Sequence, residues 1–211
     1  MRITEIFRSL QGESTFAGLP CAFVRTTGCN LRCGYCDTAY AFHGGREMTV
    51  ADVLAEVMAL GTRLVELTGG EPLLQAESFD LMAALLRRGH TVLLETGGSL
   101  PIDAVPAGVH VILDIKTPSS GEVESNRWAN LDHLDDRGQI KLVIGDRLDF
   151  DWGLDVIRAH RLVKRWPVLI SPVHDALPLE EVAGWILASG LPLRLQLQLH
   201  KYVWDPTRTG V

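Results

Sequence analysis

Three cysteines stand close together near the start of the 211-residue chain, in the string GCNLRCGYCDT. Cys29, Cys33 and Cys36 have the spacing Cys-x3-Cys-x2-Cys, and an aromatic residue, Tyr35, precedes the third of them. A 4Fe–4S cluster is normally held by four cysteine thiolates. Three thiolates on one short loop would therefore leave one iron open, and an open iron can bind a small molecule.

A zinc knuckle is the main alternative for these thiols. Structural zinc takes four ligands, often as two separated Cys-x2-Cys pairs. This chain has one triplet and no second pair, although Cys21 or His43 could supply a fourth ligand. A disulfide is disfavoured, because the four cysteines crowd into one end and MRITEIFRSL lacks the apolar stretch of a secretion signal. Cys21 stands in the apolar run CAFV, which predicts a buried strand residue rather than a ligand.

The composition narrows the class of protein. The net charge is −6 and the lysines and arginines are scattered, which argues against nucleic acid as a partner but leaves room for a small anionic substrate. The chain has no run of eighteen apolar residues, so no membrane span is predicted. Low-complexity tracts, repeats and linkers are absent, so we expect one globular domain over residues 1–211, in a cytoplasmic enzyme.

Apolar runs alternate with helical patterns along the chain. Strands are predicted at 21–27, 63–67, 91–96, 109–115, 140–144, 168–171 and 193–199. Helices are predicted from Thr49 to Gly61 and over 78–88, 150–160 and 179–189. Such alternation indicates a parallel α/β sheet, and about six parallel strands fit a partial (β/α) barrel. In that fold the chemistry gathers at the C-terminal ends of the strands.

A second motif, TGGEP from Thr68 to Pro72, directly follows a predicted strand. Two glycines allow the backbone to approach a ligand closely, although a glycine pair alone is equally a simple turn. Together with the cysteine triplet, the motif resembles the radical S-adenosylmethionine (SAM) superfamily. The resemblance implies a 4Fe–4S cluster that binds SAM, a GGEP contact with its methionyl amine, and a 5′-deoxyadenosyl radical formed on one-electron reduction.

Further strings make the resemblance more specific. EIFRSLQGES, CAFVRTTGCNL, Asp37-Thr38 after the last cysteine, ETGGS, DIKTPSSG, SPVHD and LQLHKYVWDP are similar to the 7-carboxy-7-deazaguanine synthase family of queuosine biosynthesis. The implied reaction converts 6-carboxy-5,6,7,8-tetrahydropterin to 7-carboxy-7-deazaguanine with loss of ammonia, and SAM is regenerated. The resemblance also implies Mg²⁺, a homodimer, and flavodoxin or ferredoxin as electron donor. Activases that make a glycyl radical on a partner protein share CxxxCxxC and GGEP but have no reason to carry LQGE with CDT; a non-catalytic zinc-binding module is the alternative outside enzymes.

The resemblance assigns roles residue by residue. It implies cluster ligation by the three cysteines, magnesium ligation by Thr38, and substrate contacts by Leu10, Gln11, Gly12, Arg25 and Thr68, with Arg25 pairing the substrate carboxylate. It implies SAM contacts by Gly70, Asp114, Ile115, Lys116, Ser171, Pro172, Val173 and His174. His200, in LHKY, is at least as well explained as a structural histidine. The tail from Thr207 to Val211 continues past HKYVWDP, where shorter members of the family bring their terminal carboxylate to the substrate.

Overall fold

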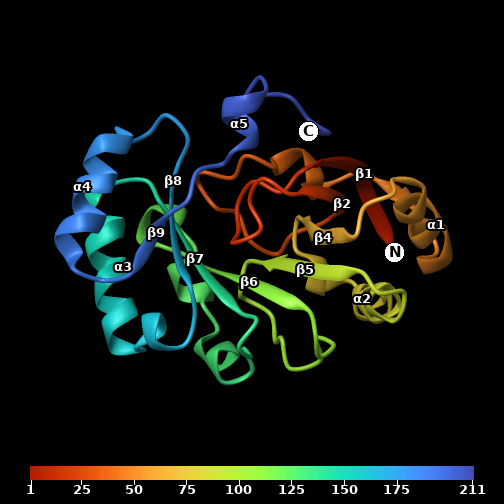
Figure 1. Ribbon diagram of the computed structural model, residues 1–211, viewed down its shortest axis with the longest axis horizontal. Coiled ribbons are helices and arrows are strands. Elements are labelled where there is room, and N and C mark those ends of the chain that lie inside the picture. The colour runs from red at the N-terminus through yellow and green to blue at the C-terminus, as the bar shows by residue number, and fades with distance from the viewer.

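The computed structural model describes residues 1–211, and its strands form one nine-stranded sheet flanked by helices (Figure 1). β2 and β4 to β9 run parallel, whereas β1 pairs antiparallel with both β2 and β3. The sheet is open, and its order is β3 (Arg46–Glu47), β1 (Arg2–Leu10), β2 (Pro20–Thr26), β4 (Leu64–Gly69), β5 (Thr91–Thr96), β6 (His110–Ile115), β7 (Gln139–Ile144), β8 (Val168–Pro172) and β9 (Leu193–Leu195). The predicted partial (β/α) barrel is confirmed, with seven parallel strands.

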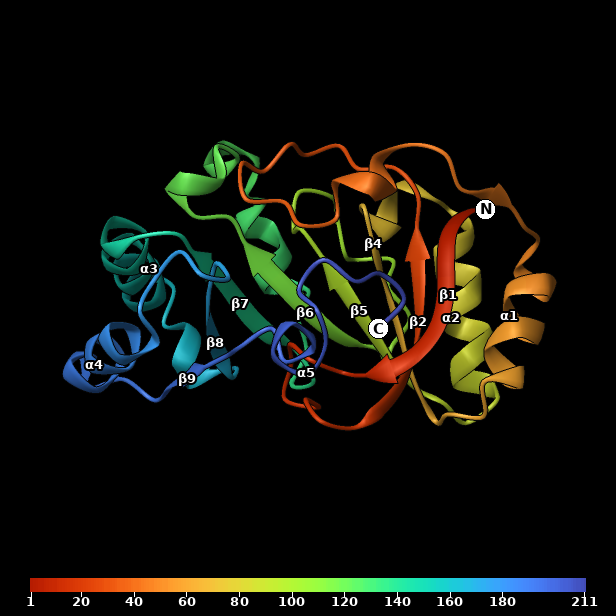
Figure 2. The ribbon, with the colours of Figure 1, turned by 90° about the horizontal axis from the view of Figure 1, so that it is seen from above.

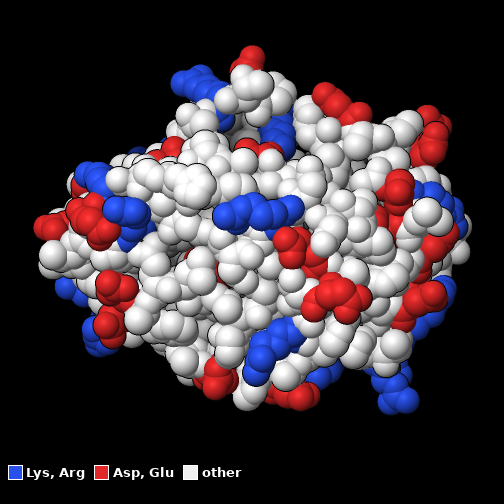
Figure 3. Space-filling model, turned by 180° about the vertical axis from the view of Figure 1, so that it is seen from behind, with Lys and Arg blue, Asp and Glu red and all other residues white.

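The four longer helices cover one face of this sheet. Figure 1 shows α1 (Val50–Ala59) and α2 (Glu77–Arg87) at one end and α3 (Arg147–Ala159) and α4 (Leu179–Ser189) at the other. A last short helix, α5 (His200–Val203), follows β9. None of the helices has the length and apolarity that a membrane crossing requires. On the face shown in Figure 3, lysine and arginine are interspersed with aspartate and glutamate.

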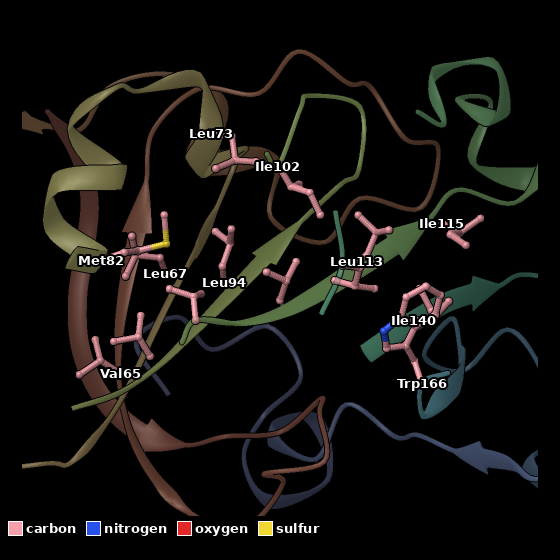
Figure 4. Packing of buried hydrophobic residues seen from close by; sticks show 14 of the residues in the cluster. Val65, Leu67, Leu73, Met82, Leu94, Ile102, Leu113, Ile115, Ile140 and Trp166 are labelled. Carbon is pink, nitrogen blue, oxygen red and sulfur yellow. The ribbon is translucent and has the colours of Figure 1, made fainter. Parts of the chain in front are cut away.

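Side chains of the parallel strands alternate between the two faces of the sheet, and the helix side is apolar. Leu67 and Leu94 stand opposite each other on β4 and β5, and Leu113 of β6 and Met82 of α2 belong to the same main core (Figure 4). This burial is the main source of stability, at about 25 cal/mol for each Å² of apolar surface removed from water.

The opposite face of the sheet changes character along the strands. At their N-terminal ends the inward residues form a small apolar cluster of Cys21, Phe23, Leu64, Leu93 and Ile112. Two positions further along, the inward residues become charged: Glu66 follows Leu64, Glu95 follows Leu93, and Asp114 follows Ile112. The apolar cluster therefore closes one end of the barrel interior, and a polar space lies above it.

The helix ends follow from local side chains. Thr49 and Asp52 form a capping box at the start of α1, and Gly61, with φ 66°, follows its end. The predicted helix over 150–160 begins three residues earlier, at Arg147, because Asp146 accepts a hydrogen bond from the Asp149 backbone and caps that turn.

Two ends of the sheet differ from the sequence prediction. β1 was not predicted, because an irregularity in its pairing between Ile3 and Glu5 breaks the alternation of its side chains. β9 ends at Leu195 rather than at 199. After Leu195 the chain leaves the sheet, since the Gln196 side chain and the Leu199 backbone both donate to the Gly12 carbonyl.

Candidate active site

A cavity of about 660 Å³ opens on the polar side of the sheet. That volume is in the range of small-molecule sites. Its walls come from β2 and β4 to β8 with the loops that follow them, from β1 and the loop after it, and from the C-terminal segment after β9. Figure 2 shows α5 and the C-terminal tail in front of the middle strands. Segments from opposite ends of the sequence therefore meet at one cavity.

The three predicted cluster ligands line this cavity. Cys29, Cys33 and Cys36 lie on the loop after β2 and are half-buried, and the Leu31 backbone donates to the Cys29 sulfur at 3.4 Å. No three side chains of His, Cys, Asp or Glu converge as a preformed metal site. The thiols therefore share one wall without meeting at a point. Cys21 is fully buried in the small apolar cluster, as predicted.

The cysteine loop is pinned by the GGEP turn. The Glu71 backbone donates to the Gly28 carbonyl at 2.7 Å, and a Cβ on Gly70 would lie 1.9 Å from that same oxygen. The buried Glu71 carboxylate accepts hydrogen bonds from the Gly97 backbone at 2.8 Å and from the Thr96 hydroxyl. Three thiols on a loop held this closely by backbone fit a 4Fe–4S cluster that keeps one iron open.

Gln11 lies at the floor of the cavity, only 2% exposed. Its Nε2 donates to Glu66 Oε2 at 3.0 Å, and its Oε1 accepts from the backbones of Glu13 and Ser14 at 3.1 Å. Burial raises the pKa of Glu66 to about 8, and the nearby Glu95 carboxylate adds to the shift. Gln11 and Gly12 are thus buried at the cavity floor rather than exposed, and Gln11 Nε2 keeps a second N–H for a pterin contact.

A charged network crosses the cavity from Thr68 to the loop after β1. Thr68 donates to Glu95 at 2.9 Å, Glu95 pairs with Lys141, and Lys141 pairs with Glu13 at 3.1 Å. Burial acts to lower the pKa of Lys141, but Glu13 and Glu95 outweigh it and the pKa is raised. Burial acts to raise the pKa of Glu95, but the Lys141 ammonium outweighs it and the pKa is lowered. Thr68 is therefore oriented by an ionised carboxylate.

The Asp37-Thr38 pair connects the cysteine loop to the C-terminal segment. Thr38 borders the cavity, and its hydroxyl donates to Asp37 at 2.9 Å. Asp37 also accepts from Lys201 at 2.6 Å and from Gln198 at 2.8 Å. Burial would raise the pKa of Asp37, yet the Lys201 ammonium holds it well below its usual range. This loop end is thereby fixed over the cavity.

The residues with a predicted SAM contact divide into two groups. Ile115 and Pro172 do not line the cavity, and Ile115 belongs to the main core because it alternates with Asp114. The side chain of Asp114 pairs through one oxygen with Lys116 at 2.7 Å, while its other oxygen is buried without a partner. Those that do line the cavity are Gly70, Asp114, Lys116, Ser171, Val173 and His174.

Two buried polar atoms near the cysteine loop have no hydrogen-bond partner. The Tyr35 hydroxyl on the cysteine loop, like the free Asp114 oxygen, is buried without a hydrogen bond. Unpaired buried polar atoms mark places where a bound molecule can supply the missing bond.

The tail from Thr207 to Val211 lines the cavity as well. His200 also lines it, and burial lowers the pKa of its imidazole, which keeps the ring neutral.

Several cavity residues were not predicted, and most of them carried a signal. Glu66, Glu95 and Lys141 are charged residues inside otherwise apolar strands, in LVELTG, TVLLET and QIKLVI. A charge in a strand covered on both sides needs a polar partner, so these positions point to a common polar interior. Glu13 and Gln198 lie in loops and carried no such signal.

Several known proteins are similar to this chain. Residues 23–161 match the family model described as "Radical SAM superfamily". The chain is 46% identical over its full length to 97% of the 7-carboxy-7-deazaguanine synthase of Chlorobaculum tepidum, and 45% identical over its full length to the whole of the enzyme of that name from Koribacter versatilis. Its fold is similar to the crystal structure of QueE from Escherichia coli, with a TM-score of 0.77, 23% identity and coverage of 93% of each chain.

Proposed function

The chain belongs to the radical SAM superfamily and, within it, to the 7-carboxy-7-deazaguanine synthases; on this premise we propose that it converts 6-carboxy-5,6,7,8-tetrahydropterin to 7-carboxy-7-deazaguanine with loss of ammonia. The reaction is a carbon–nitrogen lyase reaction in which SAM serves as a cofactor. One observation supports the proposal above all: a single cavity gathers the cysteine loop, the GGEP turn, Arg25 and the loop after β1.

The chain's own residues divide the task between two sides of the cavity. Cys29, Cys33 and Cys36 would hold the 4Fe–4S cluster, with Gly70 and the loops after β6 and β8 close by for SAM. When bound and reduced, this pair of cofactors supplies a carbon radical that removes a hydrogen atom from the substrate. The protein's part is to orient the substrate and to keep water out, which the C-terminal segment across the cavity favours.

The other side of the cavity suits a carboxylated pterin. The Arg25 guanidinium can take the substrate carboxylate through two nitrogens. The Thr68 hydroxyl, oriented by Glu95, offers an oxygen at the cavity wall. Lys141 pairs with Glu13 and Glu95 at this wall and keeps the Glu95 carboxylate ionised. The substrate contacts of Arg25 and Thr68 stay predictions.

Four further features stay part of the proposal. Thr38 would ligate Mg²⁺, which prefers oxygen ligands and takes few of them from protein. A flavodoxin or ferredoxin would supply the electron. The active form would be a homodimer, and the whole chain from residue 1 to 211 would act as one domain in the cytoplasm.

The experiment is anaerobic reconstitution followed by incubation with SAM, a strong reductant, Mg²⁺ and the carboxytetrahydropterin, with products read by mass spectrometry. We expect 7-carboxy-7-deazaguanine and unconsumed SAM. A brown, iron-loaded protein that cleaves SAM but leaves the pterin intact would contradict the proposed substrate. A colourless protein that binds zinc instead would contradict the enzyme class.

A further inference from the structure

The cross-strand neighbour of Arg25 is an acidic residue, Glu5. Glu5 on β1 stands directly opposite Arg25 on β2, and the pairing irregularity between Ile3 and Glu5 sets that register. Irregularities of this kind commonly re-aim a side chain next to a site. Arg25 Nε donates to Glu5 Oε1 at 2.7 Å, in a pair whose side chains are only 16% and 20% exposed. Arg25 lines the cavity, and Glu5 stands behind it.

A third side chain completes this arrangement. The Tyr40 hydroxyl donates to the same Glu5 oxygen at 2.8 Å. The Arg25 guanidinium also lies over the rings of Tyr40 and Phe7, 5.9 Å from each centroid. Tyr40 comes from the 3-10 helix Ala39–Phe42 that directly follows the cysteine loop. The guanidinium is thus held through Nε at one edge and by aromatic rings, and no hydrogen bond within the protein engages its two terminal nitrogens.

We infer that Glu5 and Tyr40 are positioning residues that aim Arg25 at the carboxylate of the substrate. This inference rests on the proposed function, because it assigns the ligand of Arg25. A guanidinium fixed by Nε presents its two terminal nitrogens as a fork, and that fork matches the two oxygens of a carboxylate. Without Glu5 the side chain would be free to leave this orientation. The role is one of specificity, since only a pterin that carries the carboxylate gains from the fork.

The test compares two ligands on reconstituted, SAM-loaded enzyme: the carboxytetrahydropterin and the tetrahydropterin that lacks the carboxylate. The variants are Tyr40→Phe, which keeps the ring, Glu5→Gln, which keeps an acceptor oxygen, and Glu5→Ala, which keeps neither charge nor acceptor. Glu56→Gln is the matched control, because it removes the carboxylate from the exposed Arg46–Glu56 pair elsewhere. Iron content and SAM affinity report whether each variant is intact.

We expect KM and the dissociation constant for the carboxylated pterin to rise about tenfold in Glu5→Gln and more in Glu5→Ala, as one charge-assisted hydrogen bond is weakened or lost. In Tyr40→Phe, the same two constants for the carboxylated pterin should rise several-fold. The turnover number, the SAM affinity and the affinity for the uncarboxylated pterin should match those of the wild type and of Glu56→Gln.

Two results would overturn the inference. One is an equal loss of affinity for both pterins, which would make Glu5 and Tyr40 merely structural. The other is unchanged binding of the carboxylated pterin in Glu5→Ala. Product formation by the wild type is scored separately: a wild type that makes no product contradicts the proposed function, while the two binding constants still decide the role of Glu5.

Discussion

Replacement of Gly70 by alanine should break the contact between the GGEP turn and the cysteine loop. The new Cβ would lie 1.9 Å from the Gly28 oxygen and 2.5 Å from the Gly28 carbonyl carbon. Both of these atoms belong to the backbone, so no side-chain rotation can relieve the clash. The hydrogen bond from the Glu71 backbone to the Gly28 oxygen lies in its path and would be lost as the loop moves.

The cost can be worked from these two effects. Overpacking of a tight contact costs about 1–3 kcal/mol, and loss of one hydrogen bond about 1 kcal/mol. We expect the free energy of unfolding of the iron-free protein to fall by roughly 2–4 kcal/mol. The clash also moves the thiols from their wall of the cavity, so reconstitution should yield little iron.

The assay is urea unfolding of the iron-free protein, together with iron content after reconstitution. Gly184→Ala is the control, because Gly184 lies in α4 and a Cβ there meets open space. Alanine in a helix should leave stability unchanged or raise it by up to about 1 kcal/mol. A Gly70→Ala protein with the stability and iron content of Gly184→Ala would refute the reasoning.

Three further predictions follow from the same cavity. Alanine at any one of the three loop cysteines should abolish iron binding, whereas Cys21→Ala should retain it; intact iron in a loop variant would refute the ligand assignment. Because the pKa of Glu66 is raised from 4.5 to about 8, the folded protein keeps a proton that the unfolded chain releases, so stability should fall as pH rises across that window. Glu66→Gln should remove that fall, which is at most about 5 kcal/mol at 1.36 kcal/mol per pKa unit; equal pH slopes in urea unfolding of both proteins would contradict it. Thr38→Ala should keep the cluster and SAM binding but lose most Mg²⁺-stimulated turnover, and Thr38→Ser should retain part, so a wild-type response to Mg²⁺ in the alanine variant would make Thr38 a turn residue only.

Much of the fold could be predicted because its signals are local. The strand at 91–96 has its observed bounds in the sequence, since Gly89 ends the helix before it and Gly97-Gly98 follows it. Thr49 and Gly61 likewise delimit α1. The antiparallel β1 could not be predicted in the same way, because its irregular pairing removes the period of two on which a strand prediction depends.

In the candidate site, too, the features with local signals could be predicted and the non-local contacts could not. The cysteine triplet and the GGEP turn are contiguous motifs, so their spacing is visible in the sequence. The pairing of Lys141 with Glu13 joins residues 128 positions apart, and no local pattern encodes it. The commitment of the Gln11 amide to Glu66 is equally non-local. The sequence therefore indicates which motifs surround the cavity but not which side chains are already bonded to one another.

The bond between Asp37 and Lys201 has a consequence for how the protein is made. These two residues are 164 positions apart, and at 5–20 residues per second a ribosome needs about 8–33 s to add that length. Throughout this interval the cysteine loop has been synthesised while the segment that covers it has not. If iron and sulfide are inserted during translation, the cysteine loop is still uncovered. If they are inserted after release, the bond between Asp37 and Lys201 already holds the C-terminal segment over the loop. Variants at Asp37 that weaken this bond should incorporate a cluster faster after synthesis is complete, but their cavity should exclude water less well.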